Sequence, residues 1–200
     1  MEPITASRTA FLVVHLQNDI ADEAGKFGGF FIDEIRRNDT LGKAAALLGA
    51  ARSAGAHVVY TRVGFAPDYR DLVPNSPLLG MVAQFGALVN GTWQTEIVPQ
   101  VAPVEGEVVL THTRVGGFHG SPLNEILRAK GVDTVVVLGV ATNASVEDTA
   151  RGAANRGFRT IIASDASSAA HEGAHRATLE TFGLLGETAT NEQLVAALVG

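Results

Sequence analysis

Residues 134–164 read TVVVLGVATNASVEDTARGAANRGFRTIIAS, and the class of fold can be inferred from them. The stretch begins with a run of β-branched and aliphatic residues at 134–140 and continues through an Ala-rich helical pattern at 145–156. It ends with a second apolar run at 159–164. Short apolar strands that alternate with helices are typical of βαβ units in a parallel sheet, joined by right-handed crossovers.

The same alternation extends outward along the chain. Further apolar runs occupy residues 9–15, 57–62 and 107–111, and further helical patterns lie near 39–54, 122–130 and 171–185. A last short helix is expected to begin near Asn191, whose side chain could cap it. Residues 63–106 are rich in proline, so we expect an irregular segment with one helix around 78–88. The pattern therefore predicts a doubly wound α/β fold.

Composition narrows the possible functions. With 46% hydrophobic and 18% charged residues, the chain is expected to form one globular domain over 1–200. It contains no cysteine, which excludes disulfides, thiolate metal sites and a cysteine nucleophile. A net charge of −6 without a basic run argues against nucleic acid or membrane partners. No signal peptide or membrane span is recognisable, so a cytoplasmic location is expected.

Polar residues follow the predicted strands, where ligands of open α/β sheets bind. Residues 15–19, Arg62, 112–119 and 139–145 leave the strands in this way. Ser145 stands where the predicted helix begins, and it could be either an ordinary N-cap or a nucleophile beside unpaired N–H groups. The local sequence leaves both interpretations open.

Several segments carry a resemblance to a known family. They are residues 10–19 (AFLVVHLQND), 91–103, 112–123 (HTRVGGFHGSPL), 131–154 and 157–170. In these segments the chain resembles the isochorismatase-like (cysteine hydrolase) superfamily, which includes nicotinamidases, N-carbamoyl amidohydrolases and isochorismatase. The resemblance implies a three-layer α/β/α, Rossmann-like architecture with about six mostly parallel strands. It also implies a dimer or tetramer, a cis peptide between Val140 and Ala141, and an oxyanion hole formed by the N–H groups of Ala141 and Ser145.

The three catalytic positions of the superfamily depart from its pattern. Its Asp falls on His15, its Lys on His112 and its Cys on Ser145. The thiolate mechanism of the superfamily cannot operate with these residues. The metal-dependent branch carries Asp-x-His after the second strand, whereas residues 61–65 here read TRVGF, so we predict no metal. The glycine cluster at 116–120 lacks the spacing of a dinucleotide site, and no cofactor is predicted.

Three functions are compatible with these substitutions. The first is hydrolysis of a small amide, imide or ester, in which Ser145 attacks and His15 or His112 takes its proton. The second is acid–base catalysis by the histidines on a small enol ether, lactone or carbonyl compound, without a nucleophile. The third is a small-molecule-binding protein that has lost catalysis. Engineering of Ser145 from cysteine would not explain His15 and His112.

Other residues are candidates for contacts with a small-molecule substrate. The substrate-binding candidates are Gln17, Asn18, Trp93, Phe118 and His119, although turn formation or core packing would explain the first four as well. Asp19 could hold an imidazole in one tautomer. The residues expected to close the pocket are Phe27, Phe30 and Phe31. Arg62 and Arg114 could bind a substrate carboxylate or form ordinary ion pairs, whereas His57, His171 and His175 are expected to be structural or solvated.

Overall fold

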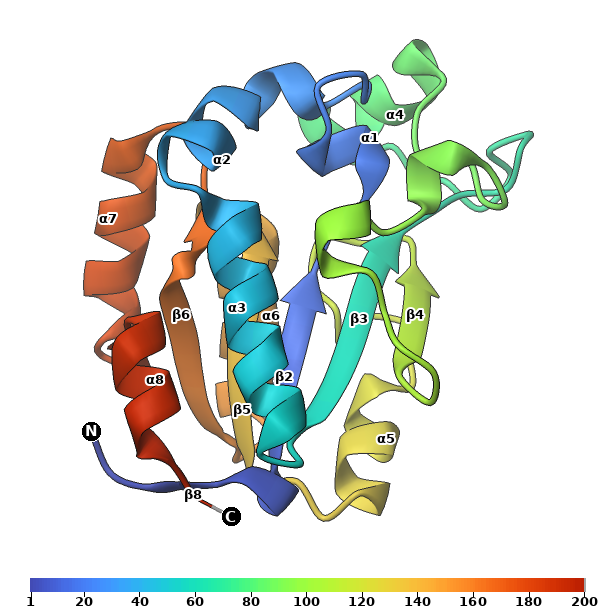
Figure 1. The fold of residues 1–200 in the computed structure, drawn as a ribbon. Helices are drawn as coiled ribbons and strands as arrows, with labels where there is room; N and C mark the ends of the chain where they lie inside the picture. The colour runs from blue at the N-terminus through green and yellow to red at the C-terminus, as the bar shows by residue number, and fades with distance from the viewer. Residues whose placement is uncertain (200) are drawn as a thin grey trace.

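A parallel six-stranded sheet forms the centre of the structure, a computed structural model that describes residues 1–199 (Figure 1). The strand order is β4-β3-β2-β5-β6-β7, and every neighbouring pair is parallel. The strands are β2 (Thr9–Val14), β3 (His57–Val63), β4 (Val108–His112), β5 (Thr134–Val140), β6 (Arg159–Ser168) and β7 (Glu187–Ala189). The doubly wound α/β/α architecture expected from the sequence is confirmed.

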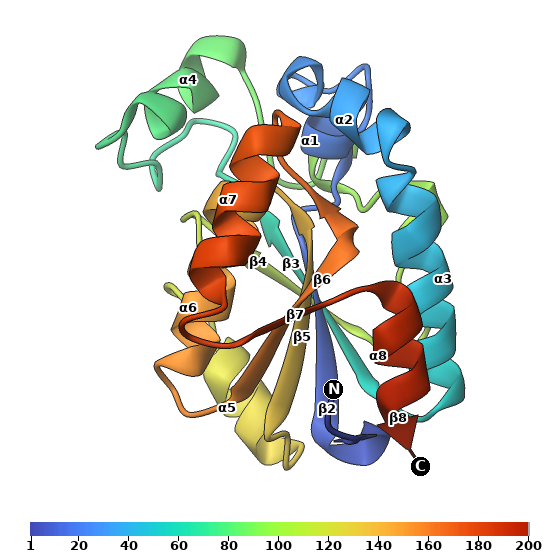
Figure 2. The ribbon, with the colours of Figure 1, turned by 90° about the vertical axis from the view of Figure 1, so that its left-hand side faces the viewer.

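Helices cover both faces of this sheet (Figure 2). One face carries α3 (Thr40–Ser53) and α8 (Asn191–Ala197), and the other carries α5 (Leu123–Ala129), α6 (Glu147–Ala154) and α7 (Glu172–Phe182). Three more helices, α1 (Asn18–Ala21), α2 (Ile32–Arg37) and α4 (Pro77–Phe85), lie beyond the carboxyl ends of the strands. These three helices form the roof over the site described below.

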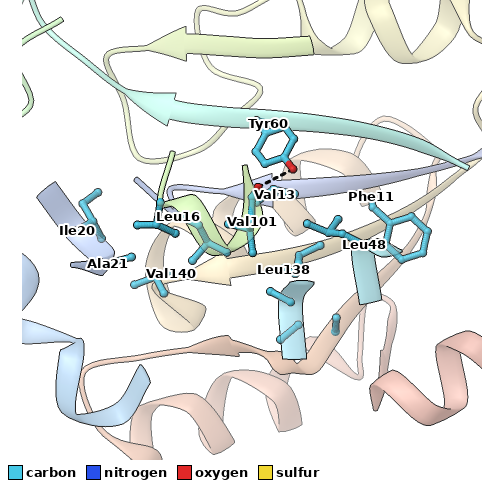
Figure 3. Close-up of a cluster of buried hydrophobic side chains, with 14 of the residues drawn as sticks. Phe11, Val13, Leu16, Ile20, Ala21, Leu48, Tyr60, Val101, Leu138 and Val140 are labelled. Atoms are coloured by element: carbon cyan, nitrogen blue, oxygen red, sulfur yellow. Dashed lines mark hydrogen bonds between the residues drawn. The ribbon is translucent and has the colours of Figure 1, made fainter. Parts of the chain in front are cut away.

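Side-chain alternation along β2 explains why the sheet needs a helical layer on each face. Phe11 and Val13 belong to the hydrophobic core on the α3 side, whereas Leu12 and Val14 belong to the core on the α5 and α6 side. Successive side chains of a strand point to opposite faces, so a strand without polar positions must be covered twice. On the α3 side, the buried hydroxyl of Tyr60 donates to the carbonyl of Val101 at 2.8 Å (Figure 3).

The direction of winding reverses between β2 and β5. From β2 the chain proceeds outward through β3 and β4, and it then returns to the centre for β5 before building β6 and β7. The loops that leave β2 and β5 therefore diverge at their carboxyl ends, which is the usual position of a ligand site in such sheets.

Local boundaries differ from the predictions at several places. The N-cap of α8 is Thr190, which forms a reciprocal capping box with Gln193, whereas the Asn191 side chain donates to the carbonyl of Lys43. The predicted helix at 145–156 begins instead as a π-helical turn, η5 (Thr142–Val146), which leads into α6. Ser145 is therefore not an N-cap, because it is the fourth residue of this turn.

Short elements were missed by the sequence pattern. Helices α1 and α2 were not predicted, and neither was β7, which has only three residues. The chain ends pair with each other as β1 (Ile4–Thr5) and β8 (Leu198–Val199) in a small parallel sheet. Elements of this length carry too little periodicity to be recognised locally. Within residues 1–199, no helix combines the length and hydrophobicity that crossing a membrane would require.

Candidate active site

A small cavity lies at the carboxyl ends of the strands, under the roof formed by α1, α2 and α4. Its volume is about 80 Å³. The polar or charged side chains on its wall are His15, Arg114 and Ser145. The apolar lining consists of Ile20, Phe27, Phe31, Val63, Leu78, Leu79, Val82, Leu88, Val115, Val140, Ala141 and Ala144. The cavity therefore suits a compact molecule with few polar groups.

Two buried histidines contact each other at this site, and of the two only His15 lines the cavity. His15 follows β2 and His112 ends β4, and their side chains are 2% and 3% exposed. The two Nε2 atoms lie 3.1 Å apart, within hydrogen-bonding distance. His15 has a φ of 53°, a left-handed conformation that non-glycine residues rarely adopt. This unusual backbone conformation turns the chain where the His15 ring meets a side chain from two strands away.

Burial keeps both imidazoles neutral near pH 7. It lowers the pKa of His15 well below 6.5, and the charge that His112 would carry lowers it further. Burial also lowers the pKa of His112 to about 4, which the backbone of Arg114 opposes and the charge of His119 reinforces. In a neutral pair, one ring donates its Nε2–H and the other accepts at Nε2. The ring that donates keeps a free lone pair on its Nδ1 atom, which can receive a further proton during a reaction, and this is the property required of a general base.

The second ring nitrogen of His112, Nδ1, has no hydrogen-bonding partner that would fix the orientation of the ring. This atom is buried and has no hydrogen-bond partner among residues 1–199, although the nearby backbone of Arg114 raises the pKa of the ring. No carboxylate orients this ring, unlike the imidazole of an ordinary catalytic triad. Asp19 cannot fill that role, because its carboxylate accepts the backbone N–H groups of Lys26 and Leu88 at 3.0 and 2.7 Å.

Ser145 reaches the cavity from the turn that follows β5. It is 8% exposed and lines the cavity together with Ala141. The peptide bond between Val140 and Ala141 is cis, as the family resemblance implies. The carbonyl of Ala141 accepts the N–H groups of Ala144 and Val146, both at 3.1 Å. The hydrogen-bonding partner of each imidazole Nε2 is the other imidazole, not the Ser145 hydroxyl.

His175 supports this turn, a role that the sequence did not reveal. Its Nδ1 lies 2.8 Å from the hydroxyl of Thr142, the first residue of η5. Burial lowers the pKa of His175, so the ring is neutral and can either accept from or donate to the hydroxyl. A side chain of α7 thus stabilises the turn that carries Ser145 through a hydrogen bond between residues 33 positions apart.

The side chains of Gln17 and Asn18 form hydrogen bonds with backbone groups and do not line the cavity. The side-chain amide of Gln17 donates to the carbonyl of Val63 and accepts from its N–H, both at 2.8 Å. The amide of Asn18 donates to the carbonyl of Trp93 at 2.9 Å. Since these polar atoms are used by neighbouring loops, the prediction that Gln17 and Asn18 contact substrate does not agree with their placement in the structure.

The aromatic candidates separate into two groups. Phe27 and Phe31 line the cavity as expected, whereas Phe30 is 48% exposed. Trp93 is largely exposed on a turn and contributes its carbonyl instead of its ring. Phe118 is buried in the core on the other side of the sheet, under the guanidinium of Arg156. The pocket-wall predictions for Phe30, Trp93 and Phe118 are therefore corrected, because solvent exposure and core packing explain these side chains.

The sequence prediction also missed the apolar side chains of the roof. Ile20 of α1 and Leu79 and Val82 of α4 close the cavity, and Leu88 follows in the next loop. A single apolar residue in a loop or short helix carries no local sign that it faces a ligand.

The two arginine candidates, Arg62 within β3 and Arg114 after β4, have different surroundings. Arg62 donates to the hydroxyl of Thr111 and to the carbonyl of Thr95, away from the cavity. Arg114 lines the cavity and also an adjoining outer depression of about 420 Å³, where His119 is found. His119 thus lies in the entrance region and does not line the inner cavity.

The donor set does not resemble a metal centre. No group of three or more His, Cys, Asp or Glu side chains within residues 1–199 is arranged to hold a metal ion. His15 and His112 offer two nitrogens, one short of the three protein ligands usual in catalytic zinc sites.

Comparisons with known proteins agree with this architecture. Residues 9–193 match the isochorismatase domain. The chain is 32% identical to ureidoacrylate amidohydrolase RutB of Methylorubrum extorquens, over 98% of this chain and 87% of that protein. It superposes on a cysteine hydrolase from Pseudomonas syringae pv. phaseolicola with a TM-score of 0.87 and 28% identity, covering 98% and 95% of the two chains.

A further solved structure of similar fold is the N-carbamoylsarcosine amidase from Thermoplasma acidophilum. The TM-score is 0.74 at 26% identity, with 92% of this chain and 97% of that chain covered. One of these structural neighbours is named a cysteine hydrolase, whereas this chain has no cysteine. The match over nearly the whole chain and the shared fold show that this protein belongs to the isochorismatase family of hydrolases.

Proposed function

We propose that this protein hydrolyses a small amide, imide or ester, with Ser145 as the nucleophile and His15 as its general base. The observation that carries the proposal is that Ser145, Ala141 and His15 line one small cavity. His112 does not line this cavity but is hydrogen bonded to His15. The two relatives named an amidohydrolase and an amidase favour an amide among these substrates.

In the first half of the reaction, the hydroxyl oxygen of Ser145 attacks the substrate carbonyl carbon as His15 accepts the hydroxyl proton. The developing oxyanion is stabilised by the N–H groups of Ala141 and Ser145. When the carbon–nitrogen bond breaks, protonated His15 returns the proton to the leaving nitrogen, and an acyl ester of Ser145 is left. Water then attacks this ester with the same base, which releases the acid and regenerates the serine.

His112 is assigned the task of positioning His15 and stabilising its charged form. By accepting the Nε2–H of His15, His112 can hold the His15 ring in one orientation, as a carboxylate does in a catalytic triad, and Nδ1 of His15 is then the basic nitrogen. A neutral partner stabilises imidazolium less than a carboxylate would, so the base is weaker than in an ordinary triad.

One observation favours a second candidate, acid–base catalysis without a nucleophile. Each imidazole Nε2 is bonded to the other imidazole, so within residues 1–199 no hydrogen bond joins Ser145 to either of these histidines. His15 would then exchange protons directly with an enol ether, lactone or carbonyl compound, and Ser145 would only donate a hydrogen bond.

Steady-state turnover of the wild type and of Ser145→Ala, His15→Ala and His112→Ala distinguishes the two candidates. The panel contains small amides, imides, esters, lactones and enol ethers, with products detected by mass spectrometry. The proposal expects turnover to be lost in Ser145→Ala and an acyl-enzyme mass to appear on the wild type. Turnover that survives in Ser145→Ala but not in His15→Ala would favour acid–base catalysis, and no turnover of any compound would overturn both.

Other features stay predictions from the sequence and the family resemblance. They are the single domain over 1–200, the cytoplasmic location, the assembly into a dimer or tetramer, and a role of His119 at the entrance. Size-exclusion chromatography with light scattering tests the assembly directly.

A further inference from the structure

Arg114 is a cationic side chain on the cavity wall that the proposed reaction does not use. It follows β4 by two residues and lines both the inner cavity and the outer depression. It therefore stands at the boundary between the apolar chamber and the solvent-facing entrance.

The guanidinium of Arg114 has only weak, neutral partners. It donates to the carbonyl of Val73 at 3.5 Å and to the side-chain oxygen of Asn75 at 3.3 Å. Charge-assisted hydrogen bonds are usually 2.7–2.9 Å long. Arg151 and Arg159, by contrast, each reach a glutamate at 2.7 Å. Within the described chain, Arg114 forms no salt bridge, and its charge is available to another partner.

Among the described residues 1–199, no acidic side chain lines the inner cavity. The other titratable residue on the wall, His15, is neutral near pH 7 because burial lowers its pKa. Asp148 lines only the outer depression, together with Ser76 and His119. Arg114 is thus the fixed positive charge among the residues that line the cavity, in surroundings where few other polar groups compete for an anion.

We propose that Arg114 binds a carboxylate of the substrate and makes the protein selective for small amides that carry this group. This inference rests on the proposed function, since it places the amide at Ser145 and the carboxylate at Arg114. The small cavity limits the apolar segment between the two groups to a few carbon atoms. Planar guanidinium suits this recognition, because it can donate two parallel hydrogen bonds to a carboxylate.

The experiment compares amides that differ only in this group. The probes are malonamate, succinamate and glutaramate, each against its uncharged diamide, and kcat/KM is measured on wild type, Arg114→Gln and Arg114→Lys. We expect the wild type to prefer at least one monoamide, and Arg114→Gln to lower kcat/KM for it by about 10- to 100-fold, mainly through KM. The diamide should be affected by less than about threefold, and Arg114→Lys should recover part of the loss.

Arg62→Gln is the matched control, because it removes an arginine charge outside the cavity that also lacks a carboxylate partner. It should leave the preference for monoamides unchanged. Equal losses for monoamide and diamide in Arg114→Gln, or a wild type that prefers none of the three monoamides, would overturn the proposal. Arg114→Lys retains the charge and keeps the test decisive if Arg114→Gln does not fold.

Binding measurements test the carboxylate site independently of the reaction mechanism. Calorimetric titration of Ser145→Ala with the same probes, with and without Arg114→Gln, measures carboxylate selectivity even if no probe is turned over. If the monoamides bind in an Arg114-dependent way but Ser145→Ala still hydrolyses them, the serine mechanism fails and the carboxylate site stands. If serine-dependent hydrolysis occurs without Arg114-dependent selectivity, the carboxylate site fails alone.

Discussion

The Nε2 atoms of His15 and His112 lie 3.1 Å apart, although 97 positions of sequence separate the two residues. Both rings are buried and neutral near pH 7, so they share one hydrogen bond without a charge. Protonation of His15 would place a positive charge on the wall of an apolar cavity that has no carboxylate among its described lining residues, and protonation of His112 would bury a charge directly behind it. Much of the behaviour expected of this protein follows from that contact.

The acid limb of the activity profile should lie at unusually low pH. The general base must be neutral, and the histidine pKa values are lowered from 6.5, to about 4 for His112. We expect kcat/KM to be constant between pH 6 and 8 and to decline only as the pH falls toward 4. Steady-state kinetics in overlapping buffers provides the check, and an acid limb centred at 6.5 or above would contradict the neutral buried pair.

Stability should depend on pH through His112. Its pKa is lower in the folded state than in the unfolded state, so the unfolded chain binds more protons between about pH 4 and 6.5. The stability contributed by the neutral ring is complete above 6.5 and is lost as the pH falls through that window. We expect the difference in unfolding free energy between pH 7.5 and pH 5 to shrink by about 2 kcal/mol in His112→Gln.

Urea unfolding of wild type and His112→Gln at the two pH values measures this difference. His171→Gln is the control, because His171 caps α7 at an exposed position and should not change the pH dependence in the same way. An unchanged pH dependence in His112→Gln would mean that the ring titrates at its ordinary pKa.

Ser145→Cys should place the only thiol of the chain in the active-site cavity. The wild type has no cysteine, so alkylation by iodoacetamide reports on this position alone. Neutral imidazoles stabilise a thiolate less than a cationic lysine does, so we expect alkylation to be slow at pH 7 and to accelerate above pH 8. Mass spectrometry follows the reaction, and rapid alkylation at pH 6 would indicate that a histidine is protonated beside the thiol.

Thr142→Val should loosen the turn that carries Ser145. The substitution removes the hydrogen bond with His175 Nδ1 and leaves a half-buried ring nitrogen without that partner. We expect a loss of about 1–2 kcal/mol in unfolding free energy and a decrease of kcat with little change of KM. Because both effects act through His175, they should be small when Thr142→Val is introduced into a His175→Leu background.

Gln17→Leu should destabilise the fold without acting on substrate binding. Its amide satisfies both the N–H and the carbonyl of Val63, and removing it leaves two buried backbone groups unpaired. We expect a loss of about 2–4 kcal/mol measured by urea unfolding. The folded fraction should keep the KM of the wild type. A large rise in KM at unchanged stability would restore Gln17 as a substrate contact.

Sequence alone determined the α/β class, the course of the five long strands and the edge of the sheet at which the site lies. Residues 134–140 carry an uninterrupted apolar run, and residues 9–14 carry another, and such runs are local signals of buried strands. The placement of His15 and Ser145 at strand ends followed from the same patterns, because the carboxyl ends of parallel strands share one edge.

Only the tertiary structure decided which side chains meet there. It paired His15 with His112, joined Thr142 to His175 by a hydrogen bond and packed Phe118 into the core on the α5 and α6 side of the sheet. It also placed Arg114 among the residues that line the cavity, where no acidic side chain of the described chain lies. It further engaged the side chain of Asn191, the predicted cap of α8, with the distant carbonyl of Lys43. Periodicity and capping preference act over a few neighbouring residues. These contacts instead join elements tens of positions apart, and their geometry is set by how the layers pack on the sheet.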